Sequence, residues 1–279
     1  MDSAFEWKQY YAAERSALGR DGMLALLDEA PAAVLADGGA LVVPHTRLQV
    51  TGSQTAAAVN GVIACGADRV LAIGVLHGGT RGDAATVGAA RAGDAAATGL
   101  LRRVHFESDH AGEEFSLDAF TEMLAVAARR ARRSIEVIRR YPFLVGDDPG
   151  TLPGLDELRA FVDEGCALVV TADPLHHGIG YGDHRSVARD EHDPQTLRWA
   201  SEAIAAQAAA LSAHRFAEFQ QLAAAYRSDF RDSGAVLALL LGRGFTWSID
   251  ELALVDYSTT LNAPAPTWVA GALVTAERA

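Results

Sequence analysis

The chain has 279 residues, with 24 Lys and Arg against 36 Asp and Glu, which gives a formal net charge of −12. This acidic balance argues against a nucleic-acid partner, because such proteins need clustered positive charge, and it disfavours docking on anionic membranes. Hydrophobic residues make up 49 % of the chain and charged residues 22 %, a globular balance that excludes disorder over most of its length. No apolar run is long and clean enough to span a bilayer.

The cysteine count and the N-terminus bear on the compartment. Cys65 and Cys166 are too few for a disulfide framework or a cysteine-built zinc site, and they fit a reducing environment. The first residues are polar and charged, unlike a signal peptide. We therefore expect a cytoplasmic protein. No linker or repeat divides the chain, so we predict a single domain over 1–279 with a helical N-terminal extension over 1–38. A homo-oligomer is one of the states that the sequence leaves open.

Apolar runs of four to six residues alternate with longer segments of helical pattern. Residues 40–45 and 69–77 have the composition of buried strands, and a small-residue helix over 54–67 joins them, which predicts a parallel βαβ unit. The elements expected after it are a helix and then a strand within 120–146, a helix over 155–165, a strand over 166–174, one or two helices over 193–230, a helix over 232–244, and closing strands over 251–260 and 267–277. This order predicts an α/β fold with a mixed, mostly buried sheet flanked by helices.

Histidines stand at the ends of three of the predicted strands. His45 and His77 end the first two, and His176 and His177 follow the third. Ligands of open α/β sheets bind outside the carboxyl ends of the strands, so these imidazoles should meet at one edge. A single histidine would more often cap a strand, but three at equivalent places favour a site.

A metal is the ligand that such a set of side chains suits. Imidazole is the commonest neutral metal ligand, and two histidines with one carboxylate form the facial set of non-haem Fe(II) oxygenases. Asp229 and Asp232 are the acidic candidates, just before a predicted helix. N-capping is the alternative role for both, and Asp232 fits it better because the apolar helix follows directly.

Several segments together carry a family resemblance. They are residues 44–79 (PHTRLQVTGSQ…VLHGG), 109–120 (DHAGEEFSLDAF), 133–147 (RSIEVIRRYPFLVGD), 169–178 (VVTADPLHHG) and the strand pair 251–260 and 267–274. In this order and spacing they resemble the Memo family over most of residues 40–275. Memo proteins are similar in fold to the class III extradiol dioxygenases of the LigB type, which bind Fe(II) through two histidines and a carboxylate.

The resemblance implies a role for each matching residue. It matches His45 and His77 with the two metal-binding histidines, and Asp173 and His176 with the Asp and His of the third motif. A histidine of that region acts as acid and base in LigB-like relatives. Asp173 would orient an imidazole or simply end its strand. His177 is adjacent to His176, and either could be the catalytic one.

The chain departs from the family at the third metal ligand. The family usually carries a metal-binding cysteine there, whereas this chain reads SDFRDSG. Aligning Arg231 with the family's basic residue puts Asp229 at the cysteine position, and a slip of three residues would make Asp232 the ligand. A carboxylate in this place is closer to the dioxygenases than to Memo itself.

A second set of residues is expected at the pocket mouth. His110 and Glu113 match the family's His-Ser-x-Glu segment, and on a helix their spacing would place them on one face. His177 would join them in contacting the substrate. The alternative is a solvated acidic first helical turn, which we favour for Glu114.

These inferences converge on one expected function. The chain would be a non-haem Fe(II)-dependent dioxygenase of the class III extradiol type, acting with O₂ on a small catechol- or aminophenol-like substrate. His45, His77 and Asp229 would hold the metal, with Zn or Cu as alternative ions, and His176 would be the acid and base. The alternatives are a metal-dependent hydrolase and a non-enzymatic Memo-like protein that binds a metal or a partner.

Overall fold

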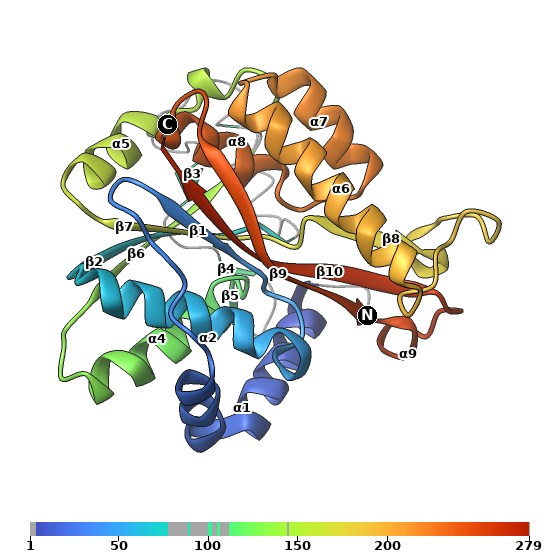
Figure 1. The fold of residues 1–279 in the computed structure, drawn as a ribbon, viewed down its shortest axis with the longest axis horizontal. Coiled ribbons are helices and arrows are strands. Elements are labelled where there is room, and N and C mark those ends of the chain that lie inside the picture. Colours follow the sequence, from blue (N-terminus) through green and yellow to red (C-terminus); the bar gives the residue numbers. More distant parts are fainter. Residues whose placement is uncertain are drawn as a thin grey trace.

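A computed structural model describes residues 4–77, 89, 100–101, 105–106, 112–143 and 145–278. The fold is α/β and is built on one mixed eight-stranded sheet (Figure 1). The strand order is β3-β6-β2-β7-β1-β10-β8, and β9 pairs with β10. The predicted fold class is confirmed.

The centre of the sheet is parallel. It consists of β6 (Glu136–Pro142), β2 (Arg69–Ile73), β7 (Ala167–Thr171) and β1 (Ala40–Val43), paired in that order. Three of these strands are nearly continuous apolar runs, because helices cover both faces of a parallel sheet and leave neither side in water. All four strands were expected from the sequence, β6 as the strand that follows a helix within 120–146.

Antiparallel strands complete the sheet. The long strands β9 (Thr246–Asp256) and β10 (Thr267–Glu277) form a hairpin, as predicted, and β10 also pairs with β1 and with β8 (Leu175–Gly178). Short strands make up the rest: β3 (Leu100–Leu101) on β6, and the separate pair β4 (His105–Phe106) and β5 (Gly112–Glu113).

The helices form two layers, one on each face of the sheet (Figure 1). One layer holds α1 (Ala4–Glu29), α2 (Leu48–Cys65) and α4 (Asp118–Arg130); the other holds α5 (Leu155–Asp163), α6 (Pro194–Ser212), α7 (Phe216–Ala225) and α8 (Arg231–Leu241). The short helix α9 (Ser258–Leu261) joins β9 to β10. None of the helices in the described part of the chain combines the length and the hydropathy needed to cross a membrane.

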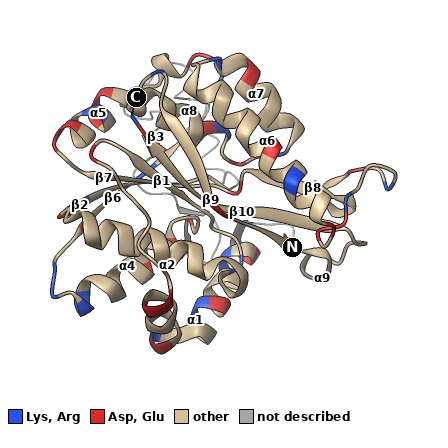
Figure 2. Ribbon diagram, in the orientation of Figure 1, with Lys and Arg blue, Asp and Glu red and all other residues tan. Residues whose placement is uncertain are grey.

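Charged residues follow these layers. Figure 2 shows acidic and basic residues mainly on helices and connecting loops. The adjacent central strands β1 and β7 carry no charged residue. The interior of the sheet is therefore a place where an isolated ionisable side chain stands out.

The N-terminal helix is packed into the domain rather than appended to it. Met23 and Leu27 of α1 are buried in the same core as α2 and α4. The Glu14 carboxylate accepts hydrogen bonds from the backbone N–H groups of Leu48 and Gln49, at 3.0 and 3.2 Å. These are two of the unpaired amides at the start of α2, which has no side-chain cap of its own. Glu14 thereby fixes α1 next to the carboxyl end of β1.

Candidate metal centre

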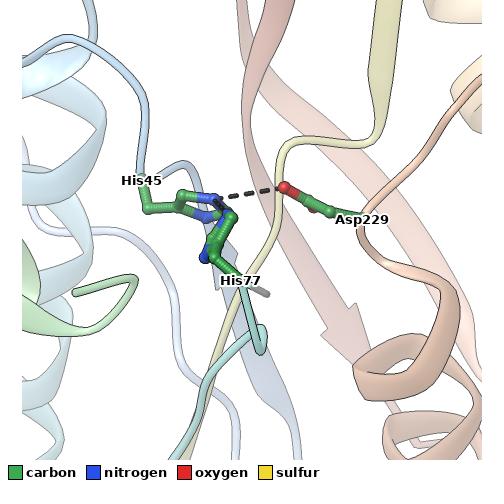
Figure 3. Close-up of side chains that lie close together, drawn as sticks. All are labelled: His45, His77 and Asp229. Carbon is green, nitrogen blue, oxygen red and sulfur yellow. Dashed lines mark hydrogen bonds and ion pairs between the residues drawn. The ribbon is translucent and has the colours of Figure 1, made fainter. Parts of the chain in front are cut away.

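Three parallel strands deliver polar side chains to one edge of the sheet. His45 follows the end of β1, His77 follows the end of β2, and Asp173 follows the end of β7. Because the strands run parallel, their carboxyl ends lie together. The expectation that His45 and His77 meet at this edge is confirmed. Asp229 joins them from the loop before α8 (Figure 3).

The donor atoms of this cluster converge on one point. His45 Nε2 lies 3.2 Å from His77 Nε2 and 3.1 Å from Asp229 Oδ2. The ligand atoms of His45, His77 and Asp229 all lie within 4.8 Å of one another, and Figure 3 shows the three side chains pointing together. Asp232, the alternative acid, is elsewhere: its carboxylate accepts a hydrogen bond from Val145 N at 3.2 Å.

These separations fit a shared metal ion. Nitrogen and carboxylate ligands lie about 2.0–2.2 Å from a zinc-sized ion, so two ligands at octahedral or tetrahedral angles lie about 2.8–3.6 Å apart. Asp229 Oδ2 is buried and makes no well-formed hydrogen bond to any described residue, although it lies close to His45. A buried carboxylate oxygen in this state has a free lone pair for a cation.

Glu114 holds the second histidine of the cluster. Its side chain is completely buried and accepts hydrogen bonds from the backbone N–H groups of His77, Phe115 and Ser116 at 2.7–3.0 Å. The same carboxylate lies 3.0 Å from His77 Nδ1. Burial alone would raise the pKa of Glu114, but His77 and the amide donors outweigh burial and lower it.

This contact fixes the tautomer of His77. An ionised carboxylate can only accept hydrogen bonds, so His77 Nδ1 must carry the proton that Glu114 receives. The lone pair of the neutral ring is then on Nε2, the atom that faces His45 and Asp229. A carboxylate behind the distal nitrogen of an imidazole is the usual support of a metal-binding histidine.

The prediction for Glu114 is wrong. It was expected in a solvated first helical turn, but α4 begins only at Asp118 and Glu114 lies in the turn that follows β5. Glu113 belongs to β5 instead of a helix, so the shared helical face proposed for it and His110 is also wrong. The side chain of Glu113 and the whole of His110 lie outside the described residues.

The two aspartates of the site are interlocked through the backbone. Asp229 Oδ1 accepts from Asp173 N at 2.7 Å, and Asp173 Oδ1 accepts from His45 N at 3.2 Å. Burial raises the pKa of Asp173 to about 6, and the neighbouring Asp229 adds to this against the pull of His45. Burial also acts on His45, but the two carboxylates outweigh it and raise the pKa of that imidazole to about 9. The cluster is therefore rich in negative charge.

The adjacent histidines of β8 face opposite sides of the strand, as alternating residues do. His176 lines the pocket next to the cluster, its Nδ1 is buried with no hydrogen-bond partner among the described residues, and burial lowers its pKa. His177 points away: its Nδ1 lies 2.8 Å from Asp183 and its Nε2 accepts from Arg189 N. The structure thus places His176, and not His177, beside the cluster.

A pocket of about 130 Å³ opens onto this cluster. Both polar and aromatic side chains line it: His45, His77, Asp173 and His176 together with Trp7, Tyr11, Phe115, Tyr181 and Tyr257. The sequence reasoning missed the aromatic residues. Tyr257 lies within the strand predicted over 251–260, and its place near the end of that strand is a signal that could have indicated it.

No family model matches the chain, and no curated protein matches it. The resemblance to Memo and the LigB type therefore stays a prediction.

Proposed function

We propose that the protein is a non-haem Fe(II)-dependent dioxygenase that acts on a small aromatic molecule of the catechol or aminophenol class. The observation that carries the proposal is the convergence of His45 Nε2, His77 Nε2 and Asp229 Oδ2 on one point at a strand edge. Two imidazoles and one carboxylate make the set that leaves coordination positions open on Fe(II).

The size and lining of the pocket favour a single-ring ligand. Its volume of about 130 Å³ is close to that of an apolar cavity of about 150 Å³ known to bind benzene. The aromatic side chains of the lining suit the faces of a ring, and the polar ones suit hydroxyl or amino substituents. A pocket with this space also argues against a purely structural metal site.

His176 is the proposed acid and base. Its ring is buried and its lowered pKa keeps it neutral near pH 7, so it can accept a proton from a substrate hydroxyl and return it later. One of its nitrogens lies within 4.8 Å of oxygens of Asp173 and Asp229, which would stabilise the imidazolium once formed. Fe(II), when bound, supplies the one-electron chemistry that O₂ requires.

The test is oxygen consumption. Protein loaded anaerobically with Fe(II) is offered a panel of catechols and aminophenols while dissolved oxygen and substrate are followed. We expect oxygen uptake coupled to substrate loss, absent with Zn(II) and absent in His45→Ala. The matched control is His192→Ala, because His192 is an exposed loop residue.

Two results would redirect the proposal. If Fe(II) is bound but no compound of the panel drives oxygen uptake, a metal-dependent hydrolase or a non-enzymatic binding role on the same site replaces it. If His45→Ala retains both iron and activity, the site itself is assigned wrongly.

A further inference from the structure

A chain of three hydroxyl groups reaches the pocket through two tyrosines. The Tyr11 hydroxyl of α1 lies 2.7 Å from the Tyr257 hydroxyl, which lies 2.6 Å from Thr46 Oγ1. All three residues are buried, and both tyrosines line the pocket. The three come from segments far apart in the sequence: α1, the turn after β1 and the turn after β9.

The protons of this chain do not balance. Each hydroxyl carries one proton, so three hydroxyls have three protons to donate. The two contacts within the chain use two of them, whichever direction the bonds run. Among the described residues, no further acceptor bonds to Tyr11, Tyr257 or the Thr46 hydroxyl. One buried donor therefore remains, and buried donors in folded proteins are normally satisfied.

We infer that Tyr11 and Tyr257 form a subsite that donates a hydrogen bond to a neutral oxygen acceptor on the ring of the ligand, such as an aldehyde, ketone, amide or ether substituent. This inference rests on the proposed function for the ring itself. It adds a second recognition point, at the Tyr11 and Tyr257 hydroxyls. The ligand would be an aromatic ring with ionisable substituents toward the metal-ligand cluster and a neutral oxygen substituent toward these hydroxyls.

The surrounding rings form a wall along which a planar ligand could lie. Trp7 stacks on Tyr11 with ring centroids 5.7 Å apart and an interplanar angle of 22°. Phe115 stacks on the ring of His77 at 4.4 Å and 23°. Tyr11 and Phe115 are themselves 5.4 Å apart, so the aromatic wall runs without a break from the metal-ligand cluster to the hydroxyl chain. A ring lying along this wall would reach both ends.

The charge of the pocket excludes an anionic substituent. Asp173 lines the pocket, with Asp229 and Glu114 behind the histidines, and none of the described lining residues is Lys or Arg. Arg15 borders only a small adjoining cavity and is paired with two acidic side chains of α4. A carboxylate at the hydroxyl chain would face Asp173 with no Lys or Arg among the described lining residues to offset the two charges, whereas a neutral acceptor needs only the free hydroxyl proton.

Binding measurements on three related probes test this subsite without requiring turnover. Catechol, 3,4-dihydroxybenzaldehyde and 3,4-dihydroxybenzoate are titrated by calorimetry into metal-free and Zn(II)-loaded protein. We expect the aldehyde to bind about fivefold to tenfold more tightly than catechol, the worth of one neutral hydrogen bond, and the benzoate to bind least.

Two variants assign the preference to the hydroxyls. The double variant Tyr11→Phe, Tyr257→Phe keeps both rings and should bind the aldehyde and catechol equally. Tyr10→Phe is the control, because the Tyr10 hydroxyl belongs to the same helix but contacts Thr260 and not the hydroxyl chain. This variant should still bind the aldehyde more tightly than catechol. If thermal unfolding shows the double variant to be misfolded, the single Tyr257→Phe and Tyr11→Phe variants replace it, and each should reduce the preference.

The outcomes separate this subsite from the proposed function. Equal binding of aldehyde and catechol to the natural chain, a preference that survives in the double variant, tighter binding of the benzoate, or no binding of any probe would each overturn the subsite. An Fe(II)-loaded protein that consumes oxygen with catechol while showing any of these results would still be a dioxygenase. A protein that shows the expected preference but never consumes oxygen would retain the subsite and lose the dioxygenase proposal.

Discussion

The substitution Glu114→Gln isolates the support of a metal ligand from the ligand itself. The variant keeps the size of the side chain and removes its charge. Glu114 uses both carboxylate oxygens as acceptors, toward His77 Nδ1 and toward three backbone N–H groups. Glutamine has only one acceptor oxygen, so whichever way its amide is turned, its NH₂ group faces at least one donor.

The expected magnitude follows from these contacts. His77 Nδ1 loses its charged partner and keeps at most an uncharged amide oxygen, and loss of such partners weakens metal binding about 10- to 100-fold, or about 1.4–2.7 kcal/mol. At least one buried donor is left unpaired, which destabilises the fold by about 1–3 kcal/mol. Both losses should appear together, because one completely buried carboxylate is responsible for both.

The assay is competition for Zn(II) and Fe(II) against a chromophoric chelator, with thermal unfolding measured on the same samples. Glu122→Gln is the matched control, since Glu122 lies on the outer part of α4 and pairs with Arg15. Metal affinity of Glu114→Gln equal to that of the natural chain, in a variant that is folded, would refute the tautomer argument for His77 and with it the role assigned to that histidine.

Three further predictions concern the same site. Asp229→Asn should lower metal affinity by at least tenfold, whereas Asp232→Asn should leave it unchanged and reduce only stability; chelator competition on both decides between the two acids. With the pKa of His45 at about 9, metal binding must displace one proton from this imidazole below that pH. Metal affinity should therefore rise about tenfold per pH unit from pH 6.5 to 9, and a flat profile would mean that His45 is not a ligand. Gly271→Ala should destabilise the protein by about 1–3 kcal/mol in denaturant unfolding, because the alanine Cβ would lie 2.6 Å from Thr51 Cγ2 and 3.0 Å from Thr46 Cγ2. Unchanged stability would show that the turn after β1 shifts at little cost to accommodate the methyl group.

Most of the fold could be predicted because its signals are local. The apolar runs that became β1, β2 and β7 are each bounded by a turn or a helix, and the helices between them have their own periodicity. The cap of α6 is local as well: Asp193, directly before Pro194, accepts a hydrogen bond from Gln195 N through Oδ1. Strand β8 escaped because it is short and pairs only with β10, a partner remote in sequence.

The site was partly predictable for a topological reason. A residue that follows a parallel strand must lie at the carboxyl edge, so His45 and His77 were placed together without knowledge of side-chain packing. Glu114 carried no such signal, because its role depends on the turn that returns the chain to His77. Tyr11 reaches the pocket only through the docking of α1, which Glu14 fixes and which no periodicity reveals.

The electrostatic cost of the cluster is itself an argument for a bound cation. Asp173, Asp229 and Glu114 are largely buried together, and within the cluster His45 is the side chain whose raised pKa offsets them with positive charge. Raising the pKa of Asp173 from 3.8 to about 6 corresponds to roughly 3 kcal/mol that disfavours its charged form. A domain with a total stability of about 5–15 kcal/mol carries such a cost only where something offsets it. A divalent cation between His45, His77 and Asp229 would offset this electrostatic cost directly. The buried negative charges that destabilise this edge of the sheet therefore favour metal binding there.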